Sequence, residues 1–315
     1  MSRQADPLFN KLVLLFGGDG FVGTHLAQEL LARGARLRIA SRHIERAFRV
    51  KPLGNLGSVQ FVRADLCRTE HHAGLVAGVD AVVNLVGAFA GDLDRLHVKA
   101  PGALAAAAQA AGVSAFVQVS ANGADADSGV DYARTKAEGE AAVLAAFPRA
   151  TVVRPSVIFG PDDKFVNMFA GLIAGLPVLP VFAPEAKLQP VFVDDVACAI
   201  ANALGAPGTF GGKTFELVGP EALTVLALNE KIAAAEGRKR LFAPLPEALA
   251  SVLAALPGVP INRDQLALLR AGNVSQGLPG LKALGVTARP LSLFLERWLV
   301  PYRPHGRFGG KSLAS

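Results

Sequence analysis

Short apolar runs alternate with amphipathic segments along the first half of the chain. The runs have the length of strands buried on both faces, and they predict strands at 11–18, 36–41, 59–65, 81–87, 115–120 and 150–161. The segments between them predict helices over 24–34 and 101–111, and a further helix that carries Tyr132 and Lys136. This alternation predicts the α/β fold class, with a doubly wound parallel sheet covered by helices on both faces.

The regular alternation weakens after Pro161, and prolines divide the remainder into short helices. We therefore predict a first domain at 1–160 and 190–219, and a smaller, mostly helical C-terminal domain at 161–189 and 220–315. Within the smaller domain, the stretch EALASVLAALPGV (247–259) is apolar on nearly all sides. At this length, such a stretch is more typical of a buried helix than of a membrane contact.

Composition adds limits on class and location. With 315 residues, 51% of them hydrophobic, the chain can bury a substantial core. Its two cysteines, Cys67 and Cys198, show no metal or redox spacing, which fits packing residues in a reducing compartment. The apolar run at the N-terminus spans five residues, fewer than a signal peptide or a membrane span needs. We therefore expect a cytoplasmic protein, with a peripheral place at the inner face of a membrane left open.

The net charge of +6 is unevenly spread. Basic side chains gather between Arg33 and Lys51, again at 238–240, and in the tail at Arg297, Arg303, Arg307 and Lys311. The aromatic residues among them, Phe48, Trp298, Tyr302 and Phe308, are few and irregularly spaced, which speaks against a nucleic-acid-binding platform. These charges are either a solvated surface or, in the basic C-terminal region, a contact to an anionic membrane worth about 1 kcal/mol per side chain.

The tail also has a helical pattern. Leu291, Phe294, Leu295 and Trp298 recur at a spacing of three to four residues, and Arg297 falls on the other side. This spacing predicts a short amphipathic helix. Its apolar face either packs on its own domain or docks on a membrane or a partner.

The first motif with chemistry is GGDGFVG, in which Phe21 and Val22 stand between the last two of the glycines Gly17, Gly20 and Gly23. The motif lies directly between a predicted strand and a predicted helix. There, glycines let the backbone turn tightly and approach a pyrophosphate at the positive helix N-terminus. This context predicts a dinucleotide-binding domain of the Rossmann type.

The end of the second strand indicates which dinucleotide binds. It reads Ala40-Ser41-Arg42-His43, without the acid that usually accepts the ribose hydroxyls of NAD. The Ser41 hydroxyl and the Arg42 guanidinium suit a 2′-phosphate, with Arg46 as a possible third partner, so NADPH (NADP) is predicted and NAD(H) is less favoured.

Two further strand ends belong to the predicted cofactor site. Asp65 and Leu66 follow the third strand, where they would meet the adenine. Leu85, Val86 and Gly87 follow the fourth strand and would line the channel beside it. The same residues could also be ordinary loops at strand ends.

A tyrosine and a lysine predict proton-transfer chemistry. Tyr132 and Lys136 are one helical turn apart and therefore share a face of their helix. The strand before them ends as Val119-Ser120-Ala121-Asn122, with an alanine where a carbonyl reductase usually keeps a hydroxyl. The residues therefore leave open whether the chain is an enzyme or a cofactor-binding protein.

Taken together, these motifs resemble a known superfamily. The glycine spacing, Asp65-Leu66, NLVG, the Tyr132/Lys136 pair and RPSVIFGP, which contains Pro155 and Val157, resemble the extended and atypical short-chain dehydrogenase/reductases (NAD-dependent epimerase/dehydratase-like) over residues 10–220. Longer stretches narrow the likeness to the NADPH-carrying accessory subunits of respiratory complex I and their bacterial relatives. These stretches are 132–170, 188–204 and LPGLKALGVTARPLS (278–292).

The superfamily resemblance implies roles for individual residues. The lysine holds the nicotinamide ribose and lowers the tyrosine pKa, the tyrosine exchanges a proton with the substrate oxygen, and a serine positions that oxygen. Tyr132 and Lys136 match their positions, but the serine position falls at Ala121. Ser120 lies one residue early and would face the other side of the strand, so Ser120 or Asn122 could serve as the third catalytic residue only if the strand bulges.

Two functions follow. The accessory-subunit resemblance implies a structural or redox-sensing NADPH, with Tyr132 and Lys136 on its ribose, and association with complex I or a quinone-pathway assembly. The intact Tyr132/Lys136 pair implies instead an active NADPH-dependent reductase, dehydrogenase or epimerase. Its substrate would be a small or lipid-like carbonyl or hydroxyl compound. No metal is implied in either case.

Overall fold

The structure, a computed structural model, describes residues 6–254 and 261–304 of the chain. The chain divides into two compact units, each assembled from separate stretches. The larger comprises Met1–Pro155, Val193–Leu217 and Gln276–Thr287. The smaller comprises Ser156–Phe192, Val218–Ser275 and Ala288–Ser315. We call them the sheet unit and the helical unit.

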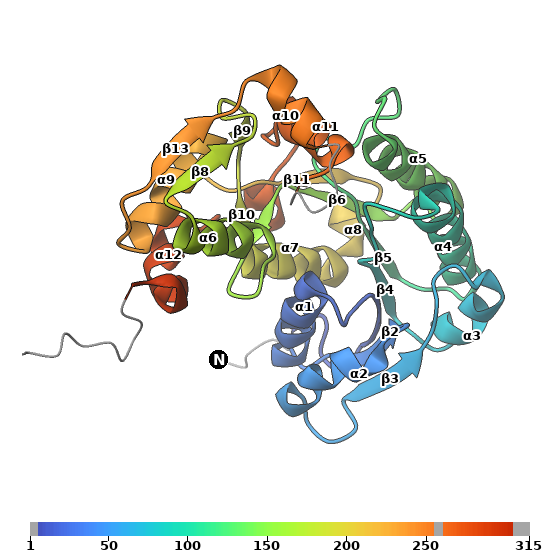
Figure 1. Ribbon diagram of the computed structural model, residues 1–315. Helices are drawn as coiled ribbons and strands as arrows, with labels where there is room; N and C mark the ends of the chain where they lie inside the picture. Colours follow the sequence, from blue (N-terminus) through green and yellow to red (C-terminus); the bar gives the residue numbers. More distant parts are fainter. Residues whose placement is uncertain (1–5, 255–260, 305–315) are drawn as a thin grey trace, which may run out of the picture. The chain divides into compact units, whose positions relative to one another are not determined.

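Seven parallel strands form the centre of the sheet unit, in the order β11-β6-β5-β4-β1-β2-β3 (Figure 1). The chain runs outward in both directions from β1 and β4, which is the arrangement of a doubly wound sheet with a switch point between these strands. The predicted fold class is thus confirmed. The strands are β1 (Leu12–Phe16), β2 (Arg36–Ser41), β3 (Val59–Arg63), β4 (Ala81–Asn84), β5 (Ala115–Val119), β6 (Thr151–Pro155) and β11 (Thr214–Leu217).

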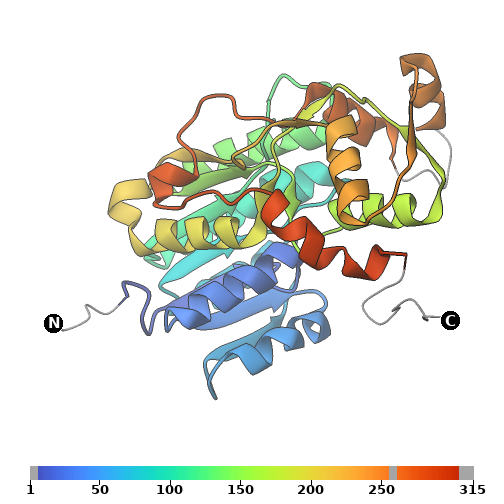
Figure 2. The ribbon, with the colours of Figure 1, turned by 90° about the vertical axis from the view of Figure 1, so that its left-hand side faces the viewer.

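Helices cover both faces of this sheet. In Figures 1 and 2, α1 and α7 lie on one face, whereas α3, α4 and α5 lie on the other. On the α3–α5 face, Leu14, Phe16, Val82 and Phe116 pack against Leu104 and Val143 in the buried core. The helices of the sheet unit are α1 (Phe21–Ala32), α2 (Ile44–Ala47), α3 (His72–Val76), α4 (Ala100–Ala110), α5 (Asp131–Ala146), α7 (Val193–Gly205), α8 (Pro207–Phe210), η1 (Phe48–Leu53), η2 (Thr69–His71), η3 (Asp94–Lys99) and η4 (Leu281–Leu284).

Two boundaries differ from the sequence-based expectation. The strand expected over 150–161 ends at Pro155, and residues after it belong to the helical unit. The segment Gln276–Thr287, expected in the smaller domain, belongs to the sheet unit. Hydrogen bonds explain this placement, since the backbone N–H of Glu216 donates to Pro279 O at 2.9 Å and the Asn202 amide donates to Leu284 O at 2.7 Å.

The helical unit combines helices with three short strand pairs. Strands β7 (Ile158–Phe159) and β10 (Val191–Phe192) pair in parallel, as do β8 (Val178–Val181) and β13 (Leu241–Pro244), whereas β9 (Lys187–Leu188) and β12 (Leu223–Thr224) pair antiparallel. The helices are α6 (Phe165–Gly175), α9 (Val225–Ala235), α10 (Glu247–Leu253), α11 (Arg263–Ala271), α12 (Ser292–Trp298) and η5 (Val300–Tyr302).

The stretch 247–259, expected as a buried helix, is only partly buried. Its described part is α10, in which Ala250 is buried while Leu249 and Val252 are 46% and 62% exposed. Residues 255–259 of this stretch lie outside the described residues. None of the helices in the described parts of the chain has the length and apolarity to cross a membrane.

The amphipathic helix of the tail forms as predicted and packs on its own unit. Phe294 and Trp298 of α12 stack with ring centroids 4.7 Å apart, and Phe294 stacks on Phe192 at 4.3 Å. Leu295 is buried, whereas Leu293 on the opposite side is 65% exposed. The apolar face of α12 is therefore occupied within the helical unit and is not free to dock elsewhere.

Candidate cofactor site

The glycine loop has the tight geometry that the motif predicts. Gly17 has φ +79°, in the left-handed region that favours glycine. A Cβ atom on Gly23 would lie 2.6 Å from both Gly17 O and Gly18 Cα, so only glycine lets α1 start this close to β1. Gly20 is the N-cap of α1, and no side chain caps the helix. The first N–H groups of a twelve-residue helix are thus left for an anion, which fits a dinucleotide pyrophosphate.

An arginine that sequence analysis did not assign to the site contacts this loop. The guanidinium of Arg49, in η1, donates from Nη2 to the backbone oxygen of Asp19 at 2.6 Å. It therefore brings a positive charge to the loop. Its sequence signal was membership of the basic run between Arg33 and Lys51, which does not distinguish it from its neighbours.

Ser41 and Arg42, the two residues expected to determine whether NADPH or NADH binds, lie at the end of β2. Ser41 is 6% exposed, and its Oγ accepts a hydrogen bond from the His43 N–H at 3.0 Å. Arg42 is exposed, and its carbonyl accepts from Arg63 Nη1 at 3.3 Å. Arg63 also lies 3.5 Å from the nearby acid, Glu45. Arg63 therefore offsets the one carboxylate in α2.

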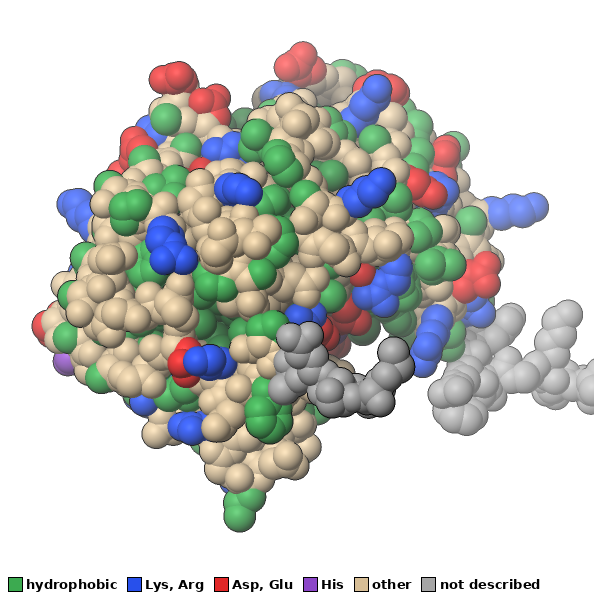
Figure 3. Space-filling model, turned by 180° about the vertical axis from the view of Figure 1, so that it is seen from behind, with side chains coloured by type: hydrophobic (Ala, Val, Ile, Leu, Met, Phe, Trp, Pro, Cys, Tyr) green, Lys and Arg blue, Asp and Glu red, His purple; other side chains and the backbone are tan. Residues whose placement is uncertain are grey.

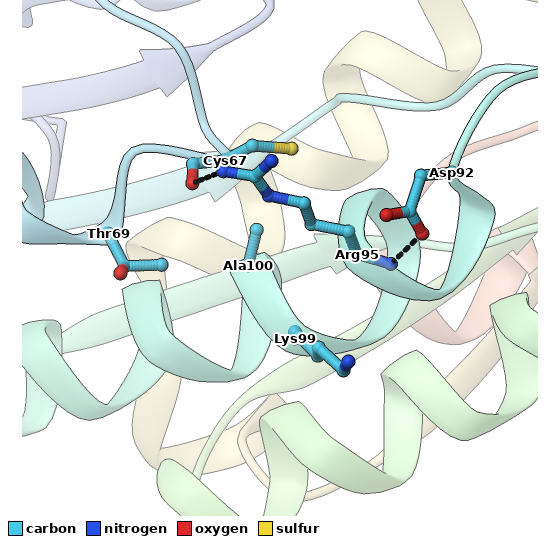
Figure 4. A pocket seen from close by; sticks show the side chains of 6 residues that line it. All are labelled: Cys67, Thr69, Asp92, Arg95, Lys99 and Ala100. Atoms are coloured by element: carbon cyan, nitrogen blue, oxygen red, sulfur yellow. Dashed lines mark hydrogen bonds between the residues drawn. The ribbon is translucent and has the colours of Figure 1, made fainter.

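Asp65 and Leu66 lie in the turn after β3. The Asp65 carboxylate accepts from the Cys67 N–H at 2.9 Å, which fixes the turn. A pocket of about 330 Å³ adjoins this turn, and Figure 4 shows Arg95 extended across it, donating from Nη2 to Cys67 O at 3.0 Å. Burial raises the pKa of the Cys67 thiol, with the nearby Asp65 carboxylate adding to the effect. The pocket is lined by Cys67, Thr69, Asp92, Arg95, Lys99 and Ala100.

The loop after β4 connects the glycine loop with Lys136. Leu85 donates its N–H to Phe16 O at 3.0 Å, and a Cβ on Gly17 would lie 3.3 Å from Val86 Cγ2. A Cβ on Gly87 would lie 3.1 Å from Lys136 Nζ. Val86 therefore lies beside Gly17, and Gly87 lies beside Lys136.

Tyr132 and Lys136 lie on the same face of α5, as their spacing predicts. Lys136 is 5% exposed, its Nζ donates to Val119 O at 3.3 Å, and it lies 5.9 Å from the centre of the Tyr132 ring. Burial lowers the Lys136 pKa to about 8, against the opposing effect of Glu140. Burial also raises the Tyr132 pKa to about 12. At neutral pH the lysine is thus charged, and the phenol is protonated and a poor acid.

The strand end before α5 is regular. The N–H of Ser120 donates to Val153 O at 2.8 Å, and the N–H of Asn122 donates to Pro155 O at 2.9 Å. The two donors are two residues apart, and so are the two acceptors. The hydrogen-bond pattern between the strands therefore has no bulge at this point. Ser120 and Ala121 therefore face opposite sides, and the Ser120 hydroxyl is buried without a hydrogen-bond partner among the described residues.

The remaining residues of the predicted site divide between the two units. Pro155 ends β6 in the sheet unit. Val157 belongs to the helical unit, where its N–H donates to the Asn273 side chain at 2.7 Å. The sheet unit alone therefore supplies the glycine loop, the β2 and β3 ends, the loop after β4 and the Tyr132/Lys136 pair.

Comparisons with known proteins agree with this arrangement. Residues 13–217 match the NAD dependent epimerase/dehydratase family. The NADH dehydrogenase [ubiquinone] 1 alpha subcomplex subunit 9 of Rattus norvegicus is 32% identical over 294 residues, covering 89% of this chain and 77% of the relative. A ceramide reductase of Caulobacter vibrioides is 32% identical over 193 residues, covering 60% of this chain and 59% of the relative.

Solved structures agree on the fold. A nucleoside-diphosphate-sugar epimerase from Staphylococcus aureus superposes with a TM-score of 0.71 at 16% identity, covering 90% of this chain and 99% of that one. With its glycine turn, its doubly wound sheet and the matched residues 13–217, the chain belongs to the NAD dependent epimerase/dehydratase family.

Proposed function

We propose that the chain holds NADPH as a structural or redox-sensing cofactor with weak or no turnover, in the manner of a complex I accessory subunit. One observation carries this proposal. The two residues that would contact the nicotinamide ribose, Tyr132 and Lys136, are present beside the loop after β4, while the position of the substrate-fixing hydroxyl is Ala121 on a strand end without a bulge. The site thus keeps what binding needs and lacks a part that catalysis needs.

NADPH rather than NADH is favoured by the end of β2. Ser41 and Arg42 offer a hydroxyl and a guanidinium to a 2′-phosphate, and Arg49 adds a second cation at the glycine loop. A charge-assisted contact of this kind contributes about 1.5–3 kcal/mol. When bound, NADPH would supply hydride chemistry, and the residues of this chain would hold its pyrophosphate, its adenosine phosphate and its nicotinamide ribose.

The proposed partner is respiratory complex I or a quinone-pathway assembly, reached from the cytoplasmic side at the membrane surface. The relatives named as NADH dehydrogenase subunits support it. The basic C-terminal region offers less than its sequence suggests, because the Arg303 guanidinium donates to Ala235 O and Glu296 O within the helical unit. Arg307 and Lys311 lie outside the described residues. Arg297 and Leu293 are exposed, and α12 can contact a partner or a membrane through these two side chains.

Figure 3 shows one face of the molecule. Lys and Arg side chains stand mostly singly over it, between hydrophobic and uncharged groups. Electrostatic attraction to an anionic surface would consequently be modest and reversible, and specific docking on a protein would have to supply the rest.

A second function is an active NADPH-dependent reductase on a lipid-like carbonyl. The ceramide reductase relative favours it, together with the intact Tyr132/Lys136 pair. In that case the charged Lys136 would hold the ribose of NADPH, which would supply the hydride when bound, and Tyr132 would donate its phenolic proton to the substrate oxygen. The high pKa of Tyr132 and the alanine at 121 weigh against an efficient reaction.

One experiment separates the two functions. The tagged chain is purified from its native host, passed through gel filtration, and analysed for bound nucleotide and co-purifying proteins. Carbonyl and quinone compounds, including a long-chain ceramide precursor ketone, are then added. About one NADPH per chain, retained and not consumed, together with co-purifying complex I subunits, is the expected result. Nucleotide-free protein, or repeated consumption of NADPH, would contradict the proposal.

A further inference from the structure

A buried histidine that the sequence analysis did not single out joins the loop after β4 to helix α5. His97 is 2% exposed and lies in η3. Its Nε2 accepts a hydrogen bond from the Ala88 N–H at 3.2 Å, so this nitrogen carries no proton. In the neutral ring the proton is therefore on Nδ1, which donates to Thr135 Oγ1 at 2.9 Å. Thr135 in turn donates to Asp131 O at 2.7 Å. Both ring nitrogens are thereby satisfied, in one chain of hydrogen bonds.

The backbone around His97 is shaped for this position. Residues 94–99 form a π-helical turn, a distortion that is frequent at functional sites. Gly139 of α5 packs on the His97 carbonyl so closely that an added Cβ would overlap it. The same face of α5 carries Tyr132, Thr135 and Lys136. The histidine is thus held between the loop and the helix that form the predicted nicotinamide end of the site.

The residue after Ala88 covers Tyr132. The Phe89 ring stacks on the Tyr132 ring, with centroids 4.3 Å apart and planes at 20°. The His97 ring meets Tyr132 edge-on at 5.7 Å. Phe89 is nevertheless 51% exposed, so a large apolar ring stays half in water while one of its faces covers a face of the Tyr132 ring. Among the described residues, the Tyr132 hydroxyl has no hydrogen-bond partner.

We propose that Phe89 is an aromatic cover on Tyr132, held in place by neutral His97 through Ala88. In this arrangement Phe89 determines access to the Tyr132 phenol, and His97 is a positioning residue that holds Phe89. The cover keeps carbonyl compounds away from the phenol while the remaining surface of the site is free for the nucleotide. It rests on the proposed function in one respect: it gives a second reason, besides Ala121, why NADPH bound here would not be consumed.

The role of His97 is tested without nucleotide. In ¹⁵N-histidine NMR the Nδ1–H tautomer is expected at neutral pH. Thr135→Val removes the acceptor of the Nδ1 proton, and Thr135→Ser keeps it. Amide hydrogen exchange at Ala88 is expected to rise at least tenfold in the Val variant and to stay near wild type in the Ser variant. An Nε2–H tautomer, or equal exchange in all three proteins, would overturn the positioning role.

The cover is tested with a small carbonyl reagent. N-acetylimidazole transfers its acetyl group to an accessible tyrosine oxygen and releases imidazole, and mass spectrometry follows the peptide that contains Tyr132. Phe89→Ala is expected to speed acetylation of Tyr132 at least tenfold. Phe48→Ala, which truncates another half-exposed phenylalanine of the sheet unit, is expected to leave it unchanged. Equal rates in wild type and Phe89→Ala would overturn the cover. Faster acetylation in a protein that binds no NADPH would leave the cover standing and remove the proposed function.

Discussion

The guanidinium of Arg49 donates a hydrogen bond to the backbone oxygen of Asp19 at 2.6 Å, and so joins η1 to the glycine loop. Arg42, at the end of β2, makes no such contact through its guanidinium in the described structure and is exposed. The two arginines therefore have separable roles. Arg49 shapes the loop that any dinucleotide would approach. The Arg42 guanidinium is free to contact the 2′-phosphate, which NADPH carries and NADH lacks.

Substitution should separate these roles. NADPH should bind at least tenfold more tightly than NADH, and Arg42→Ala should remove most of that preference, because a charge-assisted phosphate contact contributes about 1.5–3 kcal/mol. Arg49→Ala should weaken both nucleotides by similar factors. Arg36→Ala, exposed at the other end of β2, is the matched control. Fluorescence titration gives the affinities, and equal wild-type affinities for NADPH and NADH would refute the assignment.

Gly23 offers a test of the loop itself. Its missing Cβ lets α1 approach Gly17 and Gly18, so Gly23→Ala should cost about 1–3 kcal/mol of folding free energy and abolish nucleotide retention. Gly74 lies in α3 with open space around it, and Gly74→Ala should be neutral or stabilising by about 0.5–1 kcal/mol. Urea unfolding and nucleotide retention check both. A Gly23→Ala protein that retains NADPH would show that the loop does not bind the pyrophosphate.

Local patterns were enough to predict the sheet and the glycine loop. Buried parallel strands such as β1 and β5 are continuous apolar runs, and the glycines of the loop stand at fixed offsets between a strand and a helix. Residues far apart in sequence were harder. Arg49 and His97 matter through contacts with Asp19 and Thr135, 30 and 38 residues away, and neither has a motif of its own.

Boundaries after Pro155 were missed for a related reason. An apolar run continues from β6 through Ile158, but the chain passes there from the sheet unit to the helical unit, where β7 pairs with β10. The partner strand is 33 residues further along, so the local pattern does not reveal the change. Likewise, hydrogen bonds to Glu216 and Asn202 draw the segment 276–287 into the sheet unit.

Trp298 tests the packing of α12. Its ring stacks on Phe294, so Trp298→Ala should lower the free energy of unfolding by about 3 kcal/mol. Leu293→Ala, on the exposed side of the same helix, should change it by less than about 0.5 kcal/mol. Because Trp298 is the sole tryptophan, circular dichroism rather than fluorescence should follow unfolding. Equal stability of the two variants would mean that α12 is not packed on the helical unit, and would restore it as a docking helix.

Glu236 predicts an unusual dependence of stability on pH. Its side chain is fully buried, and burial raises its pKa to about 7 against the lowering effects of Arg238 and Arg240. Between about pH 4.5 and 7 the unfolded chain releases this proton and the folded chain keeps it. The contribution of Glu236 to stability is therefore complete below pH 4.5 and is lost as the pH rises through 7, by up to about 3 kcal/mol.

Glu236→Gln should therefore be more stable relative to wild type at pH 8 than at pH 5. Glu230→Gln, at an exposed position of α9, the helix whose C-cap is Glu236, should show no such difference. Denaturant unfolding at the two pH values measures the effect. The same relative stability at both pH values would mean that Glu236 is ionised in the folded protein, with Arg238 at 3.4 Å as its partner.

Tyr132 decides between a held cofactor and a consumed one. If Ala121 and the Phe89 ring have left the phenol without a substrate to protonate, Tyr132→Phe should change little in turnover. It should weaken NADPH retention by about 1 kcal/mol, the value of one ribose hydrogen bond. Lys136→Ala should weaken retention more, because a charged donor is lost.

In an active enzyme the pattern reverses, and Tyr132→Phe would abolish turnover while leaving binding almost unchanged. Multiple-turnover assays with ketones, sterols and short-chain quinones, run beside retention measurements on both variants, distinguish the cases. Robust wild-type turnover that disappears in Tyr132→Phe would refute the structural-cofactor function and would require Ser120 or Asn122 to contact the substrate oxygen after a change in the strand end.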